Sequence, residues 1–295
     1  MLANGADPAQ LRAHVTALER ERHPVSSAAA LAAAAQLVAD QLAAMGVPVE
    51  RHEFRFRGRR YHNVVGARPA QDERLPHVLV GAHFDTVSGT PGADDNASGV
   101  AAMLETVRLL ADVELNAAVE FVGFNLEEPQ GLAYRIGSRA YAADARRRGI
   151  RYRGAFVLEM VGYTDLGPGS QSVPLLLFWK RVPKTGTFLA ATGHRRSARL
   201  LRRFVGTARN AVPDLQVVTF RTPFKGWLVP DTRLSDNASF WDAGYPALML
   251  TDTAYLRNPN YHRVTDSIET LDFGFMAKVT DAVAAAVVRE AGLRE

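Results

Sequence analysis

The sequence predicts an α/β fold in which a mixed, mostly parallel central sheet lies between helices on both faces, a three-layer arrangement. Short apolar segments alternate with segments of helical composition along most of the chain, and this alternation is typical of such folds. Several apolar segments are nearly continuous in hydrophobic character, as strands are when both faces of their sheet are covered. Polar residues able to do chemistry follow these segments, where α/β sheets bind their ligands.

In the first half of the chain, helices are expected over residues 11–21 and 28–45. The second of these ends at Gly46, a residue type that commonly follows a helix. Further helices are expected over 97–110 and 137–148, each after an apolar segment. The extended segments that alternate with these helices cover 47–56, 61–67, 77–82, 118–124 and 155–158.

In the second half, helices are expected over 197–208 and 271–291, and strands over 175–179, 216–219 and 247–250. The segment 167–230 is richer in proline, glycine and basic residues, so we expect it to form an elaboration beside the sheet. The chain shows no internal repeat, low-complexity tract or linker. Residues 1–295 are therefore interpreted as one domain.

Composition restricts the chemistry that is available. The chain has 295 residues, of which 47% are apolar and 22% charged, and this composition excludes wholesale disorder. It contains no cysteine, which excludes disulfides, a thiol nucleophile and cysteine-based metal sites. Any metal ion must therefore be held by His, Asp and Glu.

Neither a membrane nor a nucleic acid is expected as a partner. The longest alanine-rich stretch, 28–39, is well short of the roughly 20 apolar residues that span a bilayer. The first seven residues lack the basic and apolar regions of a signal peptide, so we expect a cytoplasmic protein. The net charge of +4 depends on arginine, and the densest arginine cluster, at 146–153, follows a predicted helix without interleaved aromatics. We interpret this cluster as a solvated helix end.

The first motif with chemical potential is His83-Phe84-Asp85, which follows the strand expected at 77–82. Alternation along an extended chain places the side chains of His83 and Asp85 on the same side. A carboxylate beside an imidazole can fix its tautomer and strengthen it as a metal ligand. A hydrogen-bonded histidine at a strand end would give the same pattern, so the motif alone leaves both interpretations open.

Two acidic pairs follow. Asp94-Asp95-Asn96 lies in a glycine-flanked loop before a predicted helix, where capping would explain either aspartate alone. Capping explains less well why both aspartates come soon after the His-x-Asp motif.

The second acidic pair, Glu127-Glu128, follows another apolar strand. Neighbouring side chains of an extended segment point apart, so one glutamate can bind a metal while the other acts as a base on its water.

We expect these motifs to form one cluster with two further residues. These are Glu159, at the end of a strand, and His262, in a loop. Two imidazoles and three carboxylates are expected at the same edge of the sheet, namely His83, Asp95, Glu128, Glu159 and His262. They could bind two zinc ions, with one carboxylate bridging them. Two metals about 3.5–4 Å apart can hold a hydroxide and polarise a carbonyl.

In this order, the motifs resemble those of the cocatalytic di-zinc aminopeptidases of the MH clan, a family that includes bacterial leucyl aminopeptidases and glutamate carboxypeptidase II. The resemblance rests on His-x-Asp, Glu-Glu and three further runs, which are Gly-Ala-Asp-Asp-Asn-Ala-Ser-Gly from Gly92, Glu-Met-Val-Gly-Tyr from Glu159, and Tyr261-His262 followed by Thr265-Asp266.

The resemblance implies a role for each ligand. His83 and Glu159 would bind one zinc ion, Glu128 and His262 the other, and Asp95 would bridge the two. The resemblance also implies a cis peptide bond after Asp95. At position 159 the family often has aspartate, so Glu159 is a departure from its pattern.

The remaining roles follow from the same resemblance. Glu127 would be the general base, and Asp85 would support His83. Ser235-Asp236-Asn237 has Asn where relatives have His, which leaves Asp236 as a candidate for a supporting role behind the ligands. Some relatives stabilise the oxyanion with a tyrosine, and the unranked candidates here are Tyr163, Tyr255 and Tyr261.

The function implied is a zinc aminopeptidase that acts on peptides or amino-acid amides. A water held between the metals would lose a proton to Glu127 and attack the scissile carbonyl, and Glu127 would pass the proton to the leaving amine. Alternatives are a carboxypeptidase or amide deacylase of the same clan and a glutaminyl cyclase, which keeps a single zinc. Retention of His83 and Asp85 argues against the cyclase. The last alternative is an inactive, receptor-like binding module.

Overall fold

The computed structural model describes residues 4–174 and 182–293. Their strands form one eight-stranded sheet in the order β1-β2-β4-β3-β5-β8-β6-β7. Strands β4, β3, β5 and β8 run parallel, as do β6 and β7, whereas the remaining neighbours are antiparallel. The strands are β1 (Val49–Phe56), β2 (Arg59–Arg68), β3 (His77–His83), β4 (Val119–Phe124), β5 (Tyr152–Glu159), β6 (Leu189–Gly193), β7 (Val217–Arg221) and β8 (Ala247–Thr251). The predicted mixed, mostly parallel sheet is confirmed.

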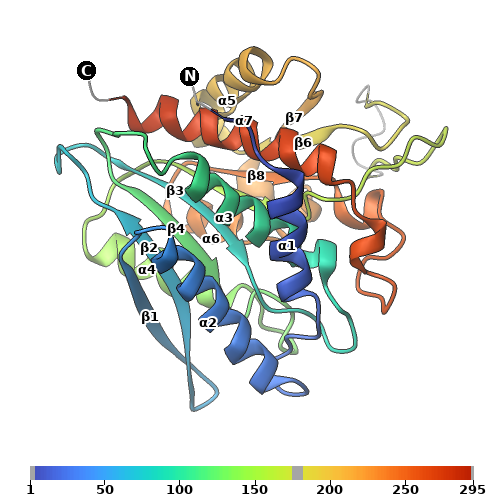
Figure 1. Ribbon diagram of the computed structural model, residues 1–295, viewed down its shortest axis with the longest axis horizontal. Coiled ribbons are helices and arrows are strands. Elements are labelled where there is room, and N and C mark those ends of the chain that lie inside the picture. The colour runs from blue at the N-terminus through green and yellow to red at the C-terminus, as the bar shows by residue number, and fades with distance from the viewer. Residues whose placement is uncertain (1–3, 175–181, 294–295) are drawn as a thin grey trace.

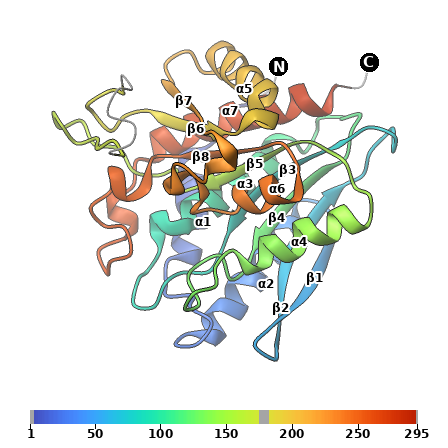
Figure 2. The ribbon, with the colours of Figure 1, turned by 180° about the vertical axis from the view of Figure 1, so that it is seen from behind.

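Helices cover both faces of the sheet, as Figures 1 and 2 show from opposite sides. Five of them lie on one face and two on the other, each set around its own cluster of buried apolar side chains. The first set is α1 (Pro8–Leu18), α2 (Ala28–Ala44), α3 (Gly99–Leu109), α5 (Ala198–Ala211) and α7 (Phe273–Ala291). The second set is α4 (Ile136–Arg147) and α6 (Asn237–Ala243).

The central strands explain why both faces need a cover. In β3, Val78 and Val80 belong to the cluster on the five-helix face, whereas Leu79 belongs to the cluster on the other face. Successive side chains of a strand point to opposite faces, so a continuous apolar strand buries both. None of the helices in the described ranges has the length and hydrophobicity required to cross a membrane.

Local sequence sets several helix ends. Asp7 caps α1, because its side chain accepts the backbone N–H of Ala9 at 2.8 Å. Asp272 caps α7 in the same way by accepting from Phe275 at 2.9 Å. Such side chains satisfy N–H groups that have no partner within the helix. Helix α2 is followed by Gly46, whose φ of 73° favours glycine.

The fold departs from the sequence prediction in its last third. The segment 167–230 was expected to be an elaboration beside the sheet, but its described residues contribute two strands, β6 and β7, to the sheet itself. Strand β6 was not predicted, since Leu-Ala-Ala-Thr-Gly has little strand propensity of its own. Helix α6 was also missed, because seven residues are too few to show a helical period. The strand expected at 175–179 lies outside the described residues.

Candidate metal centre

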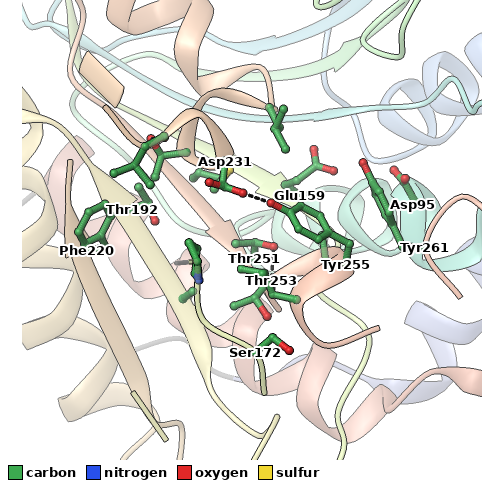
Figure 3. Close-up of a pocket in the computed structure, with 18 of the residues that line it drawn as sticks. Asp95, Glu159, Ser172, Thr192, Phe220, Asp231, Thr251, Thr253, Tyr255 and Tyr261 are labelled. Carbon is green, nitrogen blue, oxygen red and sulfur yellow. Dashed lines mark hydrogen bonds between the residues drawn. The ribbon is translucent and has the colours of Figure 1, made fainter. Parts of the chain in front are cut away.

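A cavity of about 500 Å³ opens beside the carboxyl ends of β5 and β8. At one end it reaches Asp95 and Glu159, and at the other it reaches Thr192 of β6 and Phe220 of β7 (Figure 3). Most of its wall is apolar, but four carboxylates and one histidine gather at the first end. These are five of the six residues predicted to bind metal or move protons, namely Asp95, Glu127, Glu128, Glu159 and His262, whereas the sixth, His83, is not among the described residues that line the cavity.

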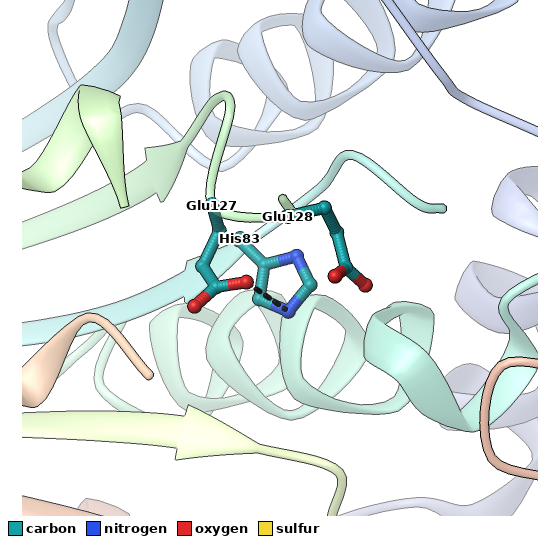
Figure 4. Close-up of side chains that lie close together, drawn as sticks. All are labelled: His83, Glu127 and Glu128. Atoms are coloured by element: carbon teal, nitrogen blue, oxygen red, sulfur yellow. Dashed lines mark ion pairs between the residues drawn. The ribbon is translucent and has the colours of Figure 1, made fainter. Parts of the chain in front are cut away.

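Strand topology brings these side chains together. His83 is the last residue of β3, and Glu159 is the last residue of β5. Glu127 and Glu128 follow β4 within four residues. Strands β4, β3 and β5 are parallel neighbours, so their carboxyl ends meet at the same edge of the sheet. Figure 4 shows the two glutamates on either side of the His83 ring.

Asp95 lies between the two imidazoles. Its Oδ1 is 3.4 Å from Nε2 of His83, and its Oδ2 is 3.1 Å from Nε2 of His262. Glu159 Oε2 is 3.4 Å from His83 Nε2, and Glu128 Oε1 is 3.4 Å from His262 Nε2. The side chains thus form two possible metal-binding groups with Asp95 in common, which are His83-Asp95-Glu159 and Asp95-Glu128-His262.

The donor atoms of these groups fit metal ions. Nε2 of His83, both oxygens of Asp95 and Nε2 of His262 are buried and have no hydrogen-bond partner within the described part of the chain. Buried polar atoms normally have a partner, because burying them without one costs free energy. Imidazole and carboxylate are zinc ligands, and no thiolate is needed. Shared coordination to metal would satisfy all four atoms.

Protonation in the cluster reflects burial and neighbouring charge. Burial raises the pKa of Glu127 well above its ordinary value, and burial together with the charge of Asp95 raises the pKa of Glu128 to about 8. Burial opposes ionisation of Asp95, but its contacts with His262 and His83 outweigh burial and hold the pKa of Asp95 below its ordinary value. The shared carboxylate is therefore ionised, as a bridging ligand must be.

Asp85 supports the site in a different way from the one expected. Nδ1 of His83 lies 3.1 Å from the backbone carbonyl oxygen of Asp85 and 3.5 Å from its carboxylate. The carboxylate instead accepts two backbone N–H groups, from Glu127 at 3.0 Å and from Glu128 at 3.1 Å. Asp85 therefore fixes the ring of His83 through its backbone and the glutamate pair through its side chain.

Asp266 holds the other acidic pair in the same manner. Its carboxylate accepts the backbone N–H groups of Asp94 at 2.9 Å and of Asp95 at 3.1 Å. The Asp95–Asn96 peptide bond is cis, as the resemblance implies. The Asn96 side chain donates to the carbonyl of Leu158 at 2.9 Å, which ties this loop to β5. Sequence reasoning noted Asp266 within a motif but gave it no role.

Arg22 is a supporting residue that sequence reasoning missed. Its guanidinium is fully buried, and burial lowers its pKa to about 10. It donates to five backbone carbonyl groups, those of Leu18, Arg20, Phe84, Pro91 and Gly92. Arg22 thus joins the end of α1 to the end of β3 and to the loop that carries Asp95. No local sequence pattern around Arg22 indicates this role.

The predicted supporting residue Asp236 and its neighbour Ser235 are both buried, and Ser235 contacts the cluster. Ser235 donates to Oε2 of Glu159 at 2.6 Å. The next residue, Asp236, is fully buried, and burial raises its pKa to about 7. Of the three tyrosine candidates, Tyr255 and Tyr261 line the cavity, and the ring of Tyr261 stacks on that of His262. Tyr163 is not among the described residues that line it.

Comparison with known proteins places the chain in a family. Residues 63–287, which include both metal-binding groups, match the sequence model of Peptidase family M28. The chain belongs to peptidase family M28. This membership confirms the resemblance seen in the sequence, and it implies that the substrates of this M28 peptidase are peptides.

Among curated proteins, the M28 peptidase is similar to the uncharacterized protein YfbL of Escherichia coli K12. The two are 34% identical over 289 residues, which cover 94% of this chain and 87% of YfbL. It is also similar to leucine aminopeptidase 1 of Arthroderma otae, with 28% identity over 73% of this chain and 54% of that protein. The chain therefore spans about half the length of this second relative.

Solved structures share the fold of the M28 peptidase. A leucine aminopeptidase precursor and a glutaminyl cyclase from Bacteroides thetaiotaomicron both superpose with a TM-score of 0.72, at 17% and 18% identity, over 96% of this chain and 97–98% of theirs. BSAP, a zinc aminopeptidase from Bacillus subtilis, superposes with a TM-score of 0.60 and 23% identity over 81% of this chain and 54% of that one. These likenesses show the three-layer fold.

Proposed function

We propose that this M28 peptidase is a zinc-dependent aminopeptidase that holds two metal ions. The observation that carries the proposal is the pair of ligand groups that share Asp95 at the end of a cavity. One ion would be held by His83, Asp95 and Glu159, and the other by Asp95, Glu128 and His262. When bound, the metals would supply Lewis acidity that polarises the scissile carbonyl and makes a water more acidic.

Glu127 is the residue proposed to move protons. It reaches the cluster without belonging to either group around Asp95, and its Oε2 is 4.0 Å from His83 Nε2. Its other oxygen, Oε1, is buried without a hydrogen-bond partner among the described residues. Because burial raises its pKa, the carboxylate is suited both to accept a proton from the attacking water and to return it to the leaving amine.

The charges around the cavity favour a free amine over a carboxylate. The charged side chains that line it, as far as the chain is described, are Asp95, Glu127, Glu128, Glu159, Asp231 and His262. Neither lysine nor arginine is among those lining residues, and the buried Arg135 contacts Tyr134 without lining the cavity itself. An acidic surround attracts an ammonium group and repels a C-terminal carboxylate. This supports aminopeptidase over carboxypeptidase activity.

The fold alone does not distinguish an aminopeptidase from a glutaminyl cyclase, since structures of both kinds superpose equally well. The proposed metal ligands favour an aminopeptidase over a glutaminyl cyclase. A cyclase that keeps a single zinc would need only one of the groups, whereas this chain retains all five ligands and the Asp85 side chain that positions the glutamate pair.

The proposal is tested by comparing amino-acid arylamides with free and N-acetylated amines, using protein whose metal content is measured by elemental analysis. We expect two zinc ions per chain, hydrolysis of the free-amine substrates and no detectable hydrolysis of the acetylated ones. Equal rates on both would indicate a deacylase instead. A single tight site with no arylamide hydrolysis would indicate the cyclase.

A further inference from the structure

The cavity contains one carboxylate that the metal centre does not use. Asp231 lies on a short 3-10 turn, Pro230–Arg233, that follows β7. Among the described lining residues it is the one charged side chain outside the metal cluster and Glu127. Figure 3 shows Asp231 between Thr192 on one side and Glu159 on the other, with a dashed line to the hydroxyl group of Tyr255. The carboxylate therefore lies within the cavity beyond the metal ligands.

Within residues 4–174 and 182–293, no cation neutralises Asp231. Its side chain accepts a hydrogen bond from the Tyr255 hydroxyl, and it forms no salt bridge with any described residue. Arg233 follows only two residues later, but its guanidinium pairs with Asp242 at 2.7 Å. The carboxylate thus keeps one neutral hydrogen-bond donor and remains available to a positively charged group from outside the chain.

Most of the wall of the cavity that holds this carboxylate is apolar. The side chains include Phe188, Val218, Val229, Leu234 and Met249. Such a wall suits the methylene stem of a long side chain, which packs against apolar surface while its charged end seeks a polar partner. A purely apolar side chain would fill the same space, but it would remove water from Asp231 without supplying a counter-charge, which is unfavourable.

We propose that this cavity selects peptides whose N-terminal residue is lysine or arginine, with Asp231 as the counter-charge of that side chain. The inference rests on the proposed aminopeptidase function, in which the metal centre holds the reacting end of the substrate. The stem lies along the apolar wall, and the terminal cation pairs with Asp231. Tyr255 positions the carboxylate through its hydroxyl group.

The test compares arylamides of lysine, arginine and norleucine, because norleucine has the stem of lysine without the charge. We expect kcat/KM of the native protein to be about 10- to 100-fold higher for lysine than for norleucine, the range of a charged hydrogen bond. Asp231→Asn should abolish this preference by lowering kcat/KM for the lysine arylamide to about that for the norleucine arylamide. Asp231→Glu should retain the preference, and thermal unfolding of each variant checks its folding.

Asp214→Asn is the matched control, since Asp214 pairs with Lys278 at the surface and does not line the cavity. It should leave the ratio of lysine to norleucine unchanged. If the native protein hydrolyses the norleucine arylamide at least as fast as the lysine one, or if Asp231→Asn keeps the preference, the assignment of Asp231 is wrong while the aminopeptidase proposal stands. If no free-amine arylamide is hydrolysed by zinc-loaded protein, both proposals are wrong.

Discussion

The carboxylate of Asp85 holds the backbone of Glu127, whose N–H group it accepts at 3.0 Å through Oδ1. Its second oxygen accepts the N–H group of Glu128 at 3.1 Å. Because the Asp85 carbonyl also contacts Nδ1 of His83, one buried aspartate sets the relative positions of a proposed metal ligand at the end of β3 and the acidic pair after β4. The proposed division of labour between the glutamates depends on this geometry.

Asp85→Asn is therefore expected to weaken the site without removing a ligand. An asparagine amide offers one acceptor oxygen, so one of the two backbone N–H groups would face an NH₂ group instead. Loss of such supporting contacts typically costs about 10- to 100-fold in metal affinity or activity. Zinc affinity, measured by competition with a chromophoric chelator, and kcat should show the loss. Unchanged values of both would contradict the positioning role.

Glu127→Gln and Glu128→Gln should fail in different ways. Removing the proposed base should lower kcat by about 10²–10⁴-fold, while both metal ions remain bound. Glu128→Gln should instead lower zinc occupancy along with the rate, because it removes a ligand of one ion. Elemental analysis beside steady-state kinetics separates the two effects. A Glu127→Gln protein with full turnover and both metals in place would show that the proton passes through another group.

Arg22→Gln should destabilise the fold. The substitution would leave most of five carbonyl groups, three of them in fully buried hydrogen bonds, without their donor. We expect a loss of about 3 kcal/mol or more in the free energy of unfolding. The nearby Arg20 is exposed, and its side chain donates to the carbonyl of Ala17. Arg20→Gln therefore serves as the control and should change stability by less than about 0.5 kcal/mol. Equal effects of the two substitutions in urea unfolding would refute the role of Arg22.

His194 should make stability depend on pH. It is buried, and burial together with the charges of Lys225 and Arg196 lowers its pKa from 6.5 to about 4. As the pH falls below 6.5, the unfolded chain binds this proton before the folded one does, so stability is lost down to about pH 4. Between pH 7.5 and 5 the loss is about 2 kcal/mol.

His194→Gln removes this titration, so the comparison isolates it. When the pH is lowered from 7.5 to 5, the unfolding free energy of the native protein should fall by about 2 kcal/mol more than that of the variant. Other groups titrate in both proteins, and their contributions cancel in the difference. A difference that stays constant with pH would mean that His194 titrates normally in the folded state.

The sequence was sufficient for the parts of the site that follow from local order along the chain. His83, Glu128 and Glu159 each come at or just after the end of an apolar strand, and parallel strands bring such ends to one edge. Asp95 and His262 were added through their motifs. The geometry places all five proposed ligands together.

Other features depend on long-range contacts that no local pattern encodes. Arg22 acts through carbonyl groups of Phe84, Pro91 and Gly92, about 60 to 70 residues away. The antiparallel pairing of β6 with β8 inserts a later strand between β5 and β6, which the sequence order does not indicate. The pair Tyr255 and Asp231 likewise joins residues 24 positions apart.

The central claim is that this M28 peptidase removes residues from the N-terminus of peptides, and the most direct test is a time course by mass spectrometry. A short peptide of distinct residues with free termini and an N-terminal lysine is incubated with zinc-loaded protein. We predict products that lose the first residue, then the second, with the C-terminus intact and no reaction after chelation of the metal. Shortening from the C-terminus, internal cleavage or an unchanged peptide would contradict the claim.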